Sequence, residues 1–237
     1  MVVLTGAGVS VASGLRPYRG PGGLWTDQPE LAARMTAGAA PDDLWHLFGP
    51  LRGELARAEP NAAHRALAAL EARVPLTVIT QNIDGLHQRA GSQSVVELHG
   101  ALGRSRCVAC DRVTEDLVPH VTAPRCECGG ALRPDVVLFE EPLPVDAEYA
   151  AKRALRDCDL FLAIGTSGTV SPASNFVRSA GTRARTPSTS TSPRWSLRTR
   201  RSVRPCSGAR RRCSPRSSAS SDERRGSREA TRLPFAA

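Results

Sequence analysis

The chain has 237 residues, 41% of them apolar and only 4% aromatic, which suits one large domain or a domain with a small insert. Its net charge of +9 is uneven: residues 178–237 hold 16 arginines and three acidic residues, a net +13, so residues 1–177 carry −4. No apolar run is long enough to cross a bilayer, and the first residues lack the basic start and length of a signal peptide. We therefore expect a cytoplasmic, reducing location.

Three short apolar runs each end in a polar or glycine-rich turn. They are 2–4 before Gly6-Ala7-Gly8, 75–79 before Gln81-Asn82-Ile83-Asp84, and 159–164 before Gly165-Thr166-Ser167. Runs of this kind are typical of buried parallel strands. In such sheets ligands bind in a crevice at the carboxyl ends of the strands. The sequence therefore predicts an α/β fold with a ligand crevice at these three turns.

Leucines at helix-compatible spacing fill the interval between the first two runs. A second helix is predicted to start at Asn61, a residue that caps helices well, just before residues 62–70. The leucines are Leu44, Leu47, Leu51, Leu55, Leu67 and Leu70.

Two cysteine pairs, Cys107-x-x-Cys110 and Cys126-x-Cys128, predict a closed four-thiolate zinc site in a compact insert at about 104–132. Four protein ligands leave no open coordination position, so the zinc is expected to be structural. The competing interpretations are chance pairs or disulfides of a secreted protein, and a reducing compartment argues against disulfides. A further thiol, Cys158, lies between two aspartates and is expected to be buried or incidental.

Three other motifs are each ambiguous alone. Gly6-Ala7-Gly8 is typical of a phosphate-binding turn, although a structural tight turn explains it almost as well. Asn82 and Asp84 could hold a sugar or carboxamide, or form a turn that satisfies its own backbone. His99 could be a general base, although a single histidine is more often structural.

Taken in order along the chain, the motifs resemble the sirtuin family, the NAD-dependent protein lysine deacylases. The ordered set is Gly6-Ala-Gly-Val-Ser10, Ser13-Gly14, Arg19-Gly20, Gly23-Leu-Trp25, Thr80-Gln-Asn-Ile-Asp-Gly-Leu-His87, Glu97-Leu-His-Gly100, the four cysteines, Arg133-Pro134-Asp-Val-Val137 and Gly165-Thr-Ser167. The resemblance covers residues 1–177. It implies a Rossmann-like catalytic domain with a small zinc-binding insert, and a cleft for NAD and an acyl-lysine peptide.

The resemblance also implies roles for single residues. His99 would be the general base, with Asn82 and Asp84 as further catalytic residues, in a reaction that passes the acyl group from lysine to ADP-ribose and releases nicotinamide. Zinc would bind Cys107, Cys110, Cys126 and Cys128. NAD would be bound by Gly6, Ala7, Gly8, Ser10, Arg19, Trp25, Gln81, Asn82, Asp84, Gly165, Thr166 and Ser167.

The acyl-lysine substrate would contact Val136, Val137 and Phe139, with Phe48 and Leu51 at the acyl group. Sirtuins that remove succinyl or malonyl groups carry a Tyr-x-x-Arg pair where this chain has Phe48 and Leu51. Without that cation a buried acyl carboxylate lacks a partner, so acetyl or another neutral acyl group is favoured. An alignment shift that recruits Arg52 would weaken this expectation.

The chain departs from the sirtuin pattern in several places. Arg16-Pro17-Tyr18 stands where the family has Pro-(Asp or Thr)-Phe, and Phe139-Glu140-Glu141 replaces Phe-Gly-Glu. The basic Arg/Ser/Thr-rich tail, 178–237, is expected to be disordered. Our hypothesis is that a frameshift replaced the native end, because a shifted reading of the 187–192 codons allows Val-Tyr-Val-Asn-Leu, a strand-like sequence. Such a change would impair the NAD site.

Two other functions remain open from the sequence. A relative could transfer ADP-ribose, because the early steps are shared, and a non-catalytic zinc-containing protein could keep only the peptide groove. The tail could bind nucleic acid, but only non-specifically, since no base-reading fold accompanies its arginines. We expect a monomer.

Overall fold

A computed structural model describes residues 1–20, 22–168, 175 and 188–190. The chain divides into two compact units, Met1–Arg201 and Ser202–Ala237, and all the described residues belong to the first. The predicted disorder of the tail, apart from 188–190, and the cysteines at 206 and 213 lie outside the described residues. No helix among the residues described is long and apolar enough to cross a membrane.

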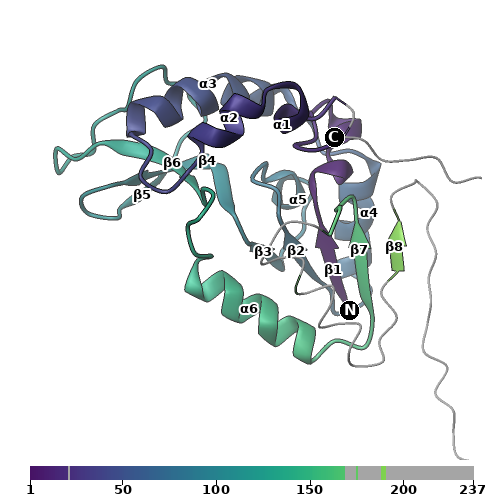
Figure 1. Cartoon of the computed structure of the whole chain (residues 1–237). Coiled ribbons are helices and arrows are strands. Elements are labelled where there is room, and N and C mark those ends of the chain that lie inside the picture. The colour runs from purple at the N-terminus through teal and green to yellow at the C-terminus, as the bar shows by residue number, and fades with distance from the viewer. Residues whose placement is uncertain (21, 169–174, 176–187, 191–237) are drawn as a thin grey trace, which may run out of the picture. The chain divides into compact units, whose positions relative to one another are not determined.

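A parallel sheet forms the centre of the first unit, with strands in the order β3-β2-β1-β7-β8 (Figure 1). The central strand β1 pairs in register with β2 on one side and β7 on the other, so that Thr5 lies opposite both Thr80 and Ile164. The strands are β1 (Val2–Thr5), β2 (Thr77–Thr80), β3 (Val95–Glu97), β7 (Phe161–Ile164) and β8 (Ser188–Ser190). The three predicted strands are present, and their carboxyl ends meet at one edge.

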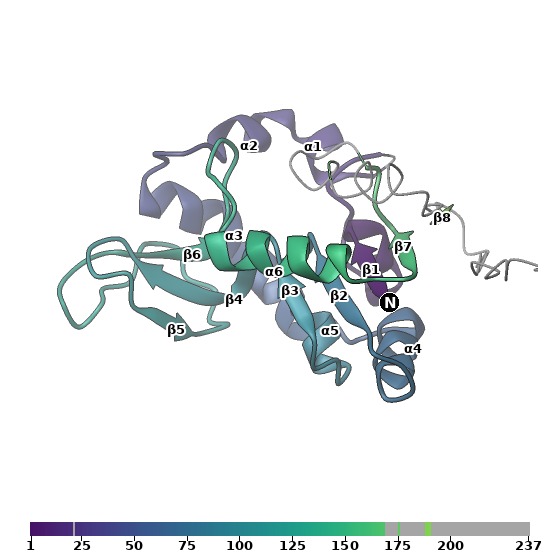
Figure 2. The same cartoon turned by 90° about the horizontal axis from the view of Figure 1, so that it is seen from below.

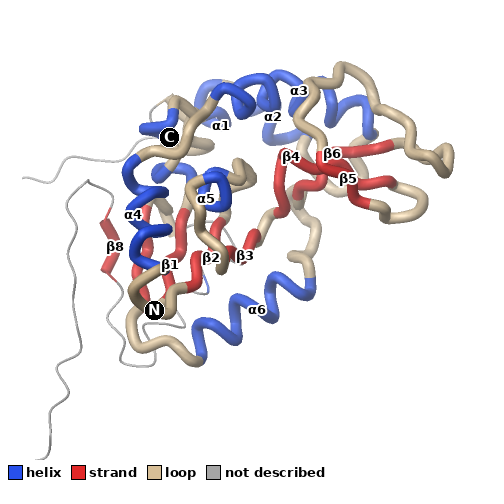
Figure 3. The backbone as a smooth tube through the Cα atoms, turned by 180° about the vertical axis from the view of Figure 1, so that it is seen from behind, coloured by secondary structure: helices blue, strands red, loops and turns tan. Residues whose placement is uncertain are grey.

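Both faces of this sheet are covered by helices (Figure 3). Helix α4 (Ala62–Glu71) buries Leu67 against one face. Helix α6 (Val145–Arg156) packs Ala151 against the other, beside Phe161. Alternate residues of a strand point to opposite faces, and both sets are apolar here, which is why the strands appear as continuous apolar runs. Cys158 is buried in the α6 core, as predicted.

The predicted start of α4 is confirmed. Asn61 is the N-cap residue, and its Oδ1 accepts the backbone hydrogen of Ala63 at 2.8 Å. His64 returns the contact, because its Nδ1 accepts the backbone hydrogen of Asn61 at 3.2 Å. This reciprocal capping box fixes the first turn of the helix and with it the orientation of the His64 ring.

A second, antiparallel sheet of three strands forms the cysteine-containing insert, in the order β5-β4-β6 (Figure 2). Its strands are β4 (Gly100–Cys107), β5 (Val113–Glu115) and β6 (Leu132–Val136). The apolar run 136–139 overlaps the end of β6 by one residue. Val136 ends β6 opposite Gly100, and Phe139 makes only an isolated bridge to Thr36.

Helix α3 (Pro41–Arg57) lies against the insert, with Phe48 and Leu55 in a core shared with Leu102 and Val136. The short helices α1 (Leu24–Asp27), α2 (Pro29–Arg34) and α5 (Leu86–Arg89) complete the helices described, with two 3-10 turns at Ala7–Val9 and Val11–Ser13.

Strand β8 lies in the segment where the sequence analysis expected no strand. Ser188, Thr189 and Ser190 pair in parallel with Leu162, Ala163 and Ile164 of β7. Serine and threonine here lack the apolar pattern by which the other strands were predicted. The pairing places this part of the tail at the edge of the sheet.

Candidate active site

The first part of the site is a close approach between the turns after β1 and β7. Gly8 donates its backbone hydrogen to the carbonyl of Gly165 at 2.9 Å. A Cβ atom on Gly8 would lie 2.9 Å from the Cα of Gly165, and one on Gly6 would lie 2.8 Å from its carbonyl oxygen. Gly165 itself has a φ of 63°, a conformation that favours glycine. The glycines are thus required for the packing of the two turns, and Gly8 is the one among them that is exposed.

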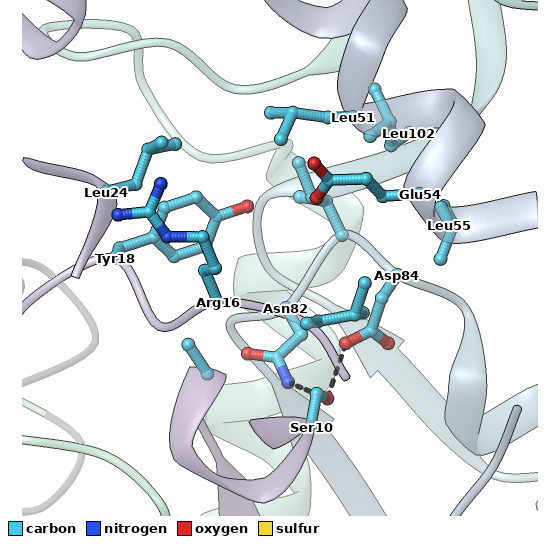
Figure 4. Close-up of a pocket in the computed structure, with 13 residues that line it drawn as sticks. Ser10, Arg16, Tyr18, Leu24, Leu51, Glu54, Leu55, Asn82, Asp84 and Leu102 are labelled. Carbon is cyan, nitrogen blue, oxygen red and sulfur yellow. Dashed lines mark hydrogen bonds between the residues drawn. The ribbon is translucent and has the colours of Figure 1, made fainter. Parts of the chain in front are cut away.

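The second part is a hydrogen-bond network around Ser10 (Figure 4). The Ser10 hydroxyl donates to Asp84 Oδ2 at 2.6 Å and accepts from Asn82 Nδ2 at 3.1 Å. Asn82 also donates to the carbonyl of Gly6 at 3.2 Å. Its buried Oδ1 has no partner among the described residues. An unpartnered buried acceptor is costly, so the site suits a ligand that donates a hydrogen bond, such as a carboxamide.

Asp84 forms the local turn that the sequence analysis considered, and it also takes part in the Ser10 network. One carboxylate oxygen accepts from Ser10, while Oδ1 accepts the backbone hydrogen of Leu86 at 3.0 Å and closes a local turn. The turn therefore fixes the carboxylate that the network uses.

Two buried histidines, which the sequence analysis did not assign to the site, lie behind this network. His64 Nε2 is 3.5 Å from the Ser10 hydroxyl, and its ring packs edge-on against His87 at 4.8 Å. His87 in turn contacts the Thr5 hydroxyl at 3.0 Å. Burial lowers the pKa of both rings, that of His87 to about 4, so both are neutral supports. The sequence feature that could have pointed to His64 is its place three residues after the helix-capping Asn61.

The third part joins the turns after β2 and β7 to the start of β4. Gln81 Nε2 donates to Thr166 Oγ1 at 2.8 Å. His99 Nδ1 donates to the Gln81 carbonyl at 2.8 Å, since a carbonyl can only accept. That bond leaves Nε2 of His99 with a lone pair. Burial lowers the pKa of His99, an effect partly offset by the bond to Gln81, so the ring is a neutral base.

The loop after β1 places aromatic rings beside this site. Tyr18 stacks on Trp25, with ring centres 5.3 Å apart, and Trp25 meets Phe139 edge-on at 6.0 Å. Arg16 forms an ion pair with Asp27, and Arg19 is exposed. The stack brings the predicted cofactor residue Trp25 into contact with the predicted substrate residue Phe139.

An open pocket lies at this edge of the sheet (Figure 4). It joins Ala7, Ser10, Asn82 and Asp84 to the predicted acyl residue Leu51. The other predicted acyl residue, Phe48, is fully buried in the α3 core. Val136 is also buried, and Val137 donates its backbone hydrogen to the carbonyl of His99 at 3.0 Å. Ser167 follows Thr166 in the turn after β7.

Arg52, the cation that an alignment shift would recruit, points away from the pocket lining. Its side chain is fully buried and its guanidinium lies 4.4 Å from the centre of the Trp45 ring. Every nitrogen is engaged: Nε with the Leu102 carbonyl at 2.8 Å, Nη1 with Asp116 at 3.2 Å, and Nη2 with the Ser105 hydroxyl at 2.9 Å. This arginine therefore docks the insert onto α3 and is unavailable to a ligand.

The four predicted zinc ligands converge in the insert. Their sulfur atoms all lie within 4.8 Å of one another, with Cys107 and Cys128 3.4 Å apart and Cys110 and Cys126 3.8 Å apart. Ligands about 2.3 Å from a tetrahedral zinc lie about 3.8 Å from each other. The backbone hydrogen of Ala109 is directed at Cys107 Sγ over 3.4 Å, a contact that favours the thiolate. The spacing of the four sulfur atoms fits a structural zinc.

An α/β domain with a glycine-lined crevice and a four-cysteine insert is the architecture of an NAD-binding sirtuin-type protein. The sequence profile of the Sir2 family matches residues 6–172. The chain belongs to the Sir2 family.

Relatives of known sequence agree with this assignment. The NAD-dependent protein deacetylase of Sulfolobus acidocaldarius is 47% identical over 183 residues, which cover 74% of this chain and 72% of the relative. The NAD-dependent protein deacetylase of Haloarcula marismortui is 48% identical over 186 residues, covering 73% and 71%. The NAD-dependent protein deacylase of Aquifex aeolicus is 44% identical over 183 residues, covering 74% and 76%.

Solved structures are similar as well. A Sir2 homolog in complex with NAD superposes with a TM-score of 0.71 at 38% identity and covers 78% of this chain and 75% of its own. A Sir2 complex with a deacetylated peptide has a TM-score of 0.70 at 32% identity and covers 78% and 79%.

Proposed function

We propose that this chain is an NAD-dependent protein lysine deacetylase, acting on acetyl or other neutral acyl groups. The deacylase activity is that of its family. The site is assigned from the way its parts come together in the fold. The glycine turns, the Ser10 network and His99 meet at the carboxyl edge of the sheet, although they are spread over the chain. Acyl-lysine, NAD and water would give lysine, nicotinamide and O-acyl-ADP-ribose.

The residues at this edge fit NAD. The backbone of Gly6, Ala7 and Gly8 would face the diphosphate, and Ser10, Asn82 and Asp84 would hold nicotinamide and its ribose. The unpartnered Oδ1 of Asn82 suits the carboxamide hydrogens. Gln81 and Thr166, which bond each other, would hold the neighbouring part of NAD. Gly165 and Ser167 would lie beside them. Arg19 and Trp25 would lie over the cofactor. When bound, NAD supplies a bond to a nicotinamide leaving group and an ADP-ribose acceptor for the acyl group.

His99 is the residue suited to accept a proton. Its Nδ1 hydrogen is committed to the Gln81 carbonyl, so Nε2 takes the proton of the hydroxyl that attacks the acyl carbon. Asp84, held by Ser10, keeps negative charge beside the cofactor position. The reaction also needs water to be excluded while NAD is bound, because water would otherwise hydrolyse the cofactor.

The acyl-lysine would enter as an extended peptide along 136–139. This segment is fixed by Arg133, which bonds the Val136 carbonyl at 2.8 Å and pairs with Glu141 at 2.7 Å. Glu141 in turn accepts the Leu138 backbone hydrogen at 2.9 Å. Most main-chain groups of this segment are bonded within the protein, for example Phe139 N–H to the Met35 carbonyl at 2.8 Å. The substrate backbone would pair with the remaining groups, such as the Val137 carbonyl, a contact that reads little of the substrate sequence. With Arg52 engaged elsewhere, the absence of a Tyr-x-x-Arg pair at Phe48 and Leu51 supports preference for neutral acyl groups.

The zinc, one per chain, would be structural, since all four ligands are protein thiolates. We further propose that the protein is a cytoplasmic monomer of domain 1–177 plus the tail, and that the tail binds nucleic acid only non-specifically. A frameshift between Val177 and Pro187 remains our explanation of the tail, with impaired NAD binding as its expected effect. Resequencing that finds no inserted or deleted base there excludes it.

The test is NAD-dependent nicotinamide release from an acetyl-lysine peptide, compared with His99→Ala, with mass spectrometry of the ADP-ribose product. Acetylated ADP-ribose from the wild type and none from the variant supports the proposal. Nicotinamide release with ADP-ribose attached to protein indicates ADP-ribosyl transfer instead. A zinc-loaded protein that binds peptide but releases no nicotinamide is a non-catalytic binder.

A further inference from the structure

Two polar groups that none of the proposed NAD or peptide roles uses face each other in the pocket. The Tyr18 hydroxyl points into it from the loop after β1, and the Glu54 carboxylate points into it from α3 on the opposite side (Figure 4). Among the described residues neither side chain has a hydrogen-bond or ion-pair partner, and they do not bond each other. The space between them is open to a ligand group.

The surroundings of this pair are apolar. Glu54 follows Leu51 by three residues, so both lie on the same face of α3. Leu55 and Leu102 also line this side of the pocket, opposite the Ser10 end that we assign to nicotinamide. The α3 side is thus an apolar wall with a single carboxylate in it, adjoining the residue predicted to meet the acyl group.

The Tyr18 ring is held in place. It stacks on Trp25 with an angle of 21° between the rings, and the backbone hydrogen of Trp25 is donated to the Tyr18 carbonyl at 2.8 Å. Burial, and secondarily the charge of Asp84, raise the pKa of the phenol, which keeps its hydrogen. Tyr18 therefore offers a fixed hydroxyl donor, where the sirtuin pattern has phenylalanine.

The charges that line the pocket disfavour an acidic ligand on the α3 side. Glu54 and Asp84 are both carboxylates. Arg16 is the cation in the lining, and its guanidinium is already engaged by Asp27 and the Gly22 carbonyl. A carboxylate on an acyl chain would meet Glu54 without a free cation to pair with.

We propose that Glu54 and Tyr18 form a subsite for acyl groups that carry a hydroxyl on a short chain. The inference rests on the proposed deacylase function and extends it to the substrate class. A hydroxyl can donate to the Glu54 carboxylate and accept from the Tyr18 phenol at once. Glu54 is exposed before a ligand binds. A plain aliphatic chain placed between the two groups would cover them and leave them unpaired, a cost that a hydroxyl avoids.

The experiment uses one peptide carrying butyryl-, 3-hydroxybutyryl-, 4-aminobutyryl- or succinyl-lysine, with the full chain and NAD. We expect kcat/KM for the hydroxybutyryl peptide to exceed that for the butyryl peptide by about tenfold, with succinyl poorest. Glu54→Leu and Tyr18→Phe each remove the hydroxyl preference, and Glu54→Leu raises relative activity on butyryl. The matched control Glu30→Leu, exposed on α2 and outside the pocket lining, keeps the wild-type ratio.

A hydroxybutyryl to butyryl ratio of one or less in the wild type overturns the subsite, as does a ratio unchanged by both variants. Preference for 4-aminobutyryl overturns it in favour of a cation site. Equilibrium binding of the same peptides separates this inference from the proposed function. If no peptide is turned over but the hydroxybutyryl peptide binds more tightly than the butyryl peptide, and both variants remove this difference, the proposed function fails and the subsite stands. Equal binding of the two peptides to the wild type overturns the subsite.

Discussion

The Nδ1 hydrogen of His99 is donated to the main-chain carbonyl of Gln81 over 2.8 Å, so one bond joins the start of β4 to the turn after β2. The turn that carries Asn82 and Asp84 thereby also fixes the tautomer of the histidine. Cofactor-binding and proton-accepting groups are consequently held by the same short segment, and a change in either affects the other.

His99 sets the first prediction. Burial lowers the pKa of His99 below 6.5. The ring therefore stays neutral and active until the pH falls to this lowered pKa. The acid limb of a kcat/KM profile for an acetyl-lysine peptide should lie below pH 6.5, and His99→Ala should reduce kcat/KM by about 100-fold or more. An acid limb above pH 6.5, or an unaffected alanine variant, contradicts the assignment.

Removal of a zinc ligand is expected to unfold the insert. Cys126→Ser leaves three thiolates, and metal binding in such modules is itself a source of folding free energy. We expect less than one zinc per chain by elemental analysis and a lower melting temperature. Cys158→Ser, at a thiol outside the cluster, should retain the full zinc content. Full occupancy in the Cys126 variant is the result that argues against the site.

Gly8→Ala tests the contact between the β1 and β7 turns. The new methyl would lie 2.9 Å from the Cα of Gly165, so the backbone must move. We expect a loss of about 1–3 kcal/mol in the free energy of unfolding and weaker NAD binding, measured by urea denaturation and calorimetry. The control Gly53→Ala lies inside α3 with only Arg57 Nη1 nearby, at 3.9 Å, and should gain up to about 1 kcal/mol. Equal effects of the two changes would show that the contact is not tight.

Arg52 is expected to matter for stability and not for acyl choice. Arg52→Met removes a fully buried guanidinium and strands the carbonyl and carboxylate groups that it bonds. The expected loss is roughly 3 kcal/mol in urea denaturation, with no change in the relative rates on acetyl and succinyl peptides. Arg57→Met, at the exposed end of α3, should cost far less. A selective change in succinyl activity at Arg52 would show that it reaches the acyl group.

His87 predicts an acid sensitivity of the fold. Its pKa is about 4 in the folded state and near 6.5 when unfolded, chiefly because of burial. Between these values the unfolded chain binds more protons, so stability falls as the pH falls from 6.5 to 4, by on the order of 3 kcal/mol in total. His87→Gln should flatten this part of the stability–pH curve, whereas changing the exposed His46 should not. An unchanged slope in the His87 variant would locate the sensitivity elsewhere.

The sequence predicted the parts of the fold with strong local signals. Apolar runs ending in glycine or polar turns defined β1, β2 and β7, and Asn61 defined the start of α4. Strand β3 was missed because Val95–Glu97 is too short to show a period. The apolar residues of the run 136–139 are explained only by the fold, since Val136 and Leu138 are buried against α3 in the insert core.

The site was predicted in part because its residues lie in short, ordered motifs. What could not be read from spacing was which face of α3 each residue occupies. Phe48 belongs to the core, Arg52 to the contact with the insert, and Leu51 and Glu54 to the pocket. Tyr18 likewise faces Glu54 across the pocket only because of the fold, since 36 positions separate the two residues in the chain.

Strand β8 pairs with β7 in the parallel register of the rest of the sheet, from Ser188 opposite Leu162 to Ser190 opposite Ile164. Parallel pairing joins main-chain groups, which every residue except proline possesses. A gene read in either of two frames across these codons could therefore supply a strand at the same position. The position of a strand at this sheet edge would then be the same in both reading frames, whereas its side chains would differ between them.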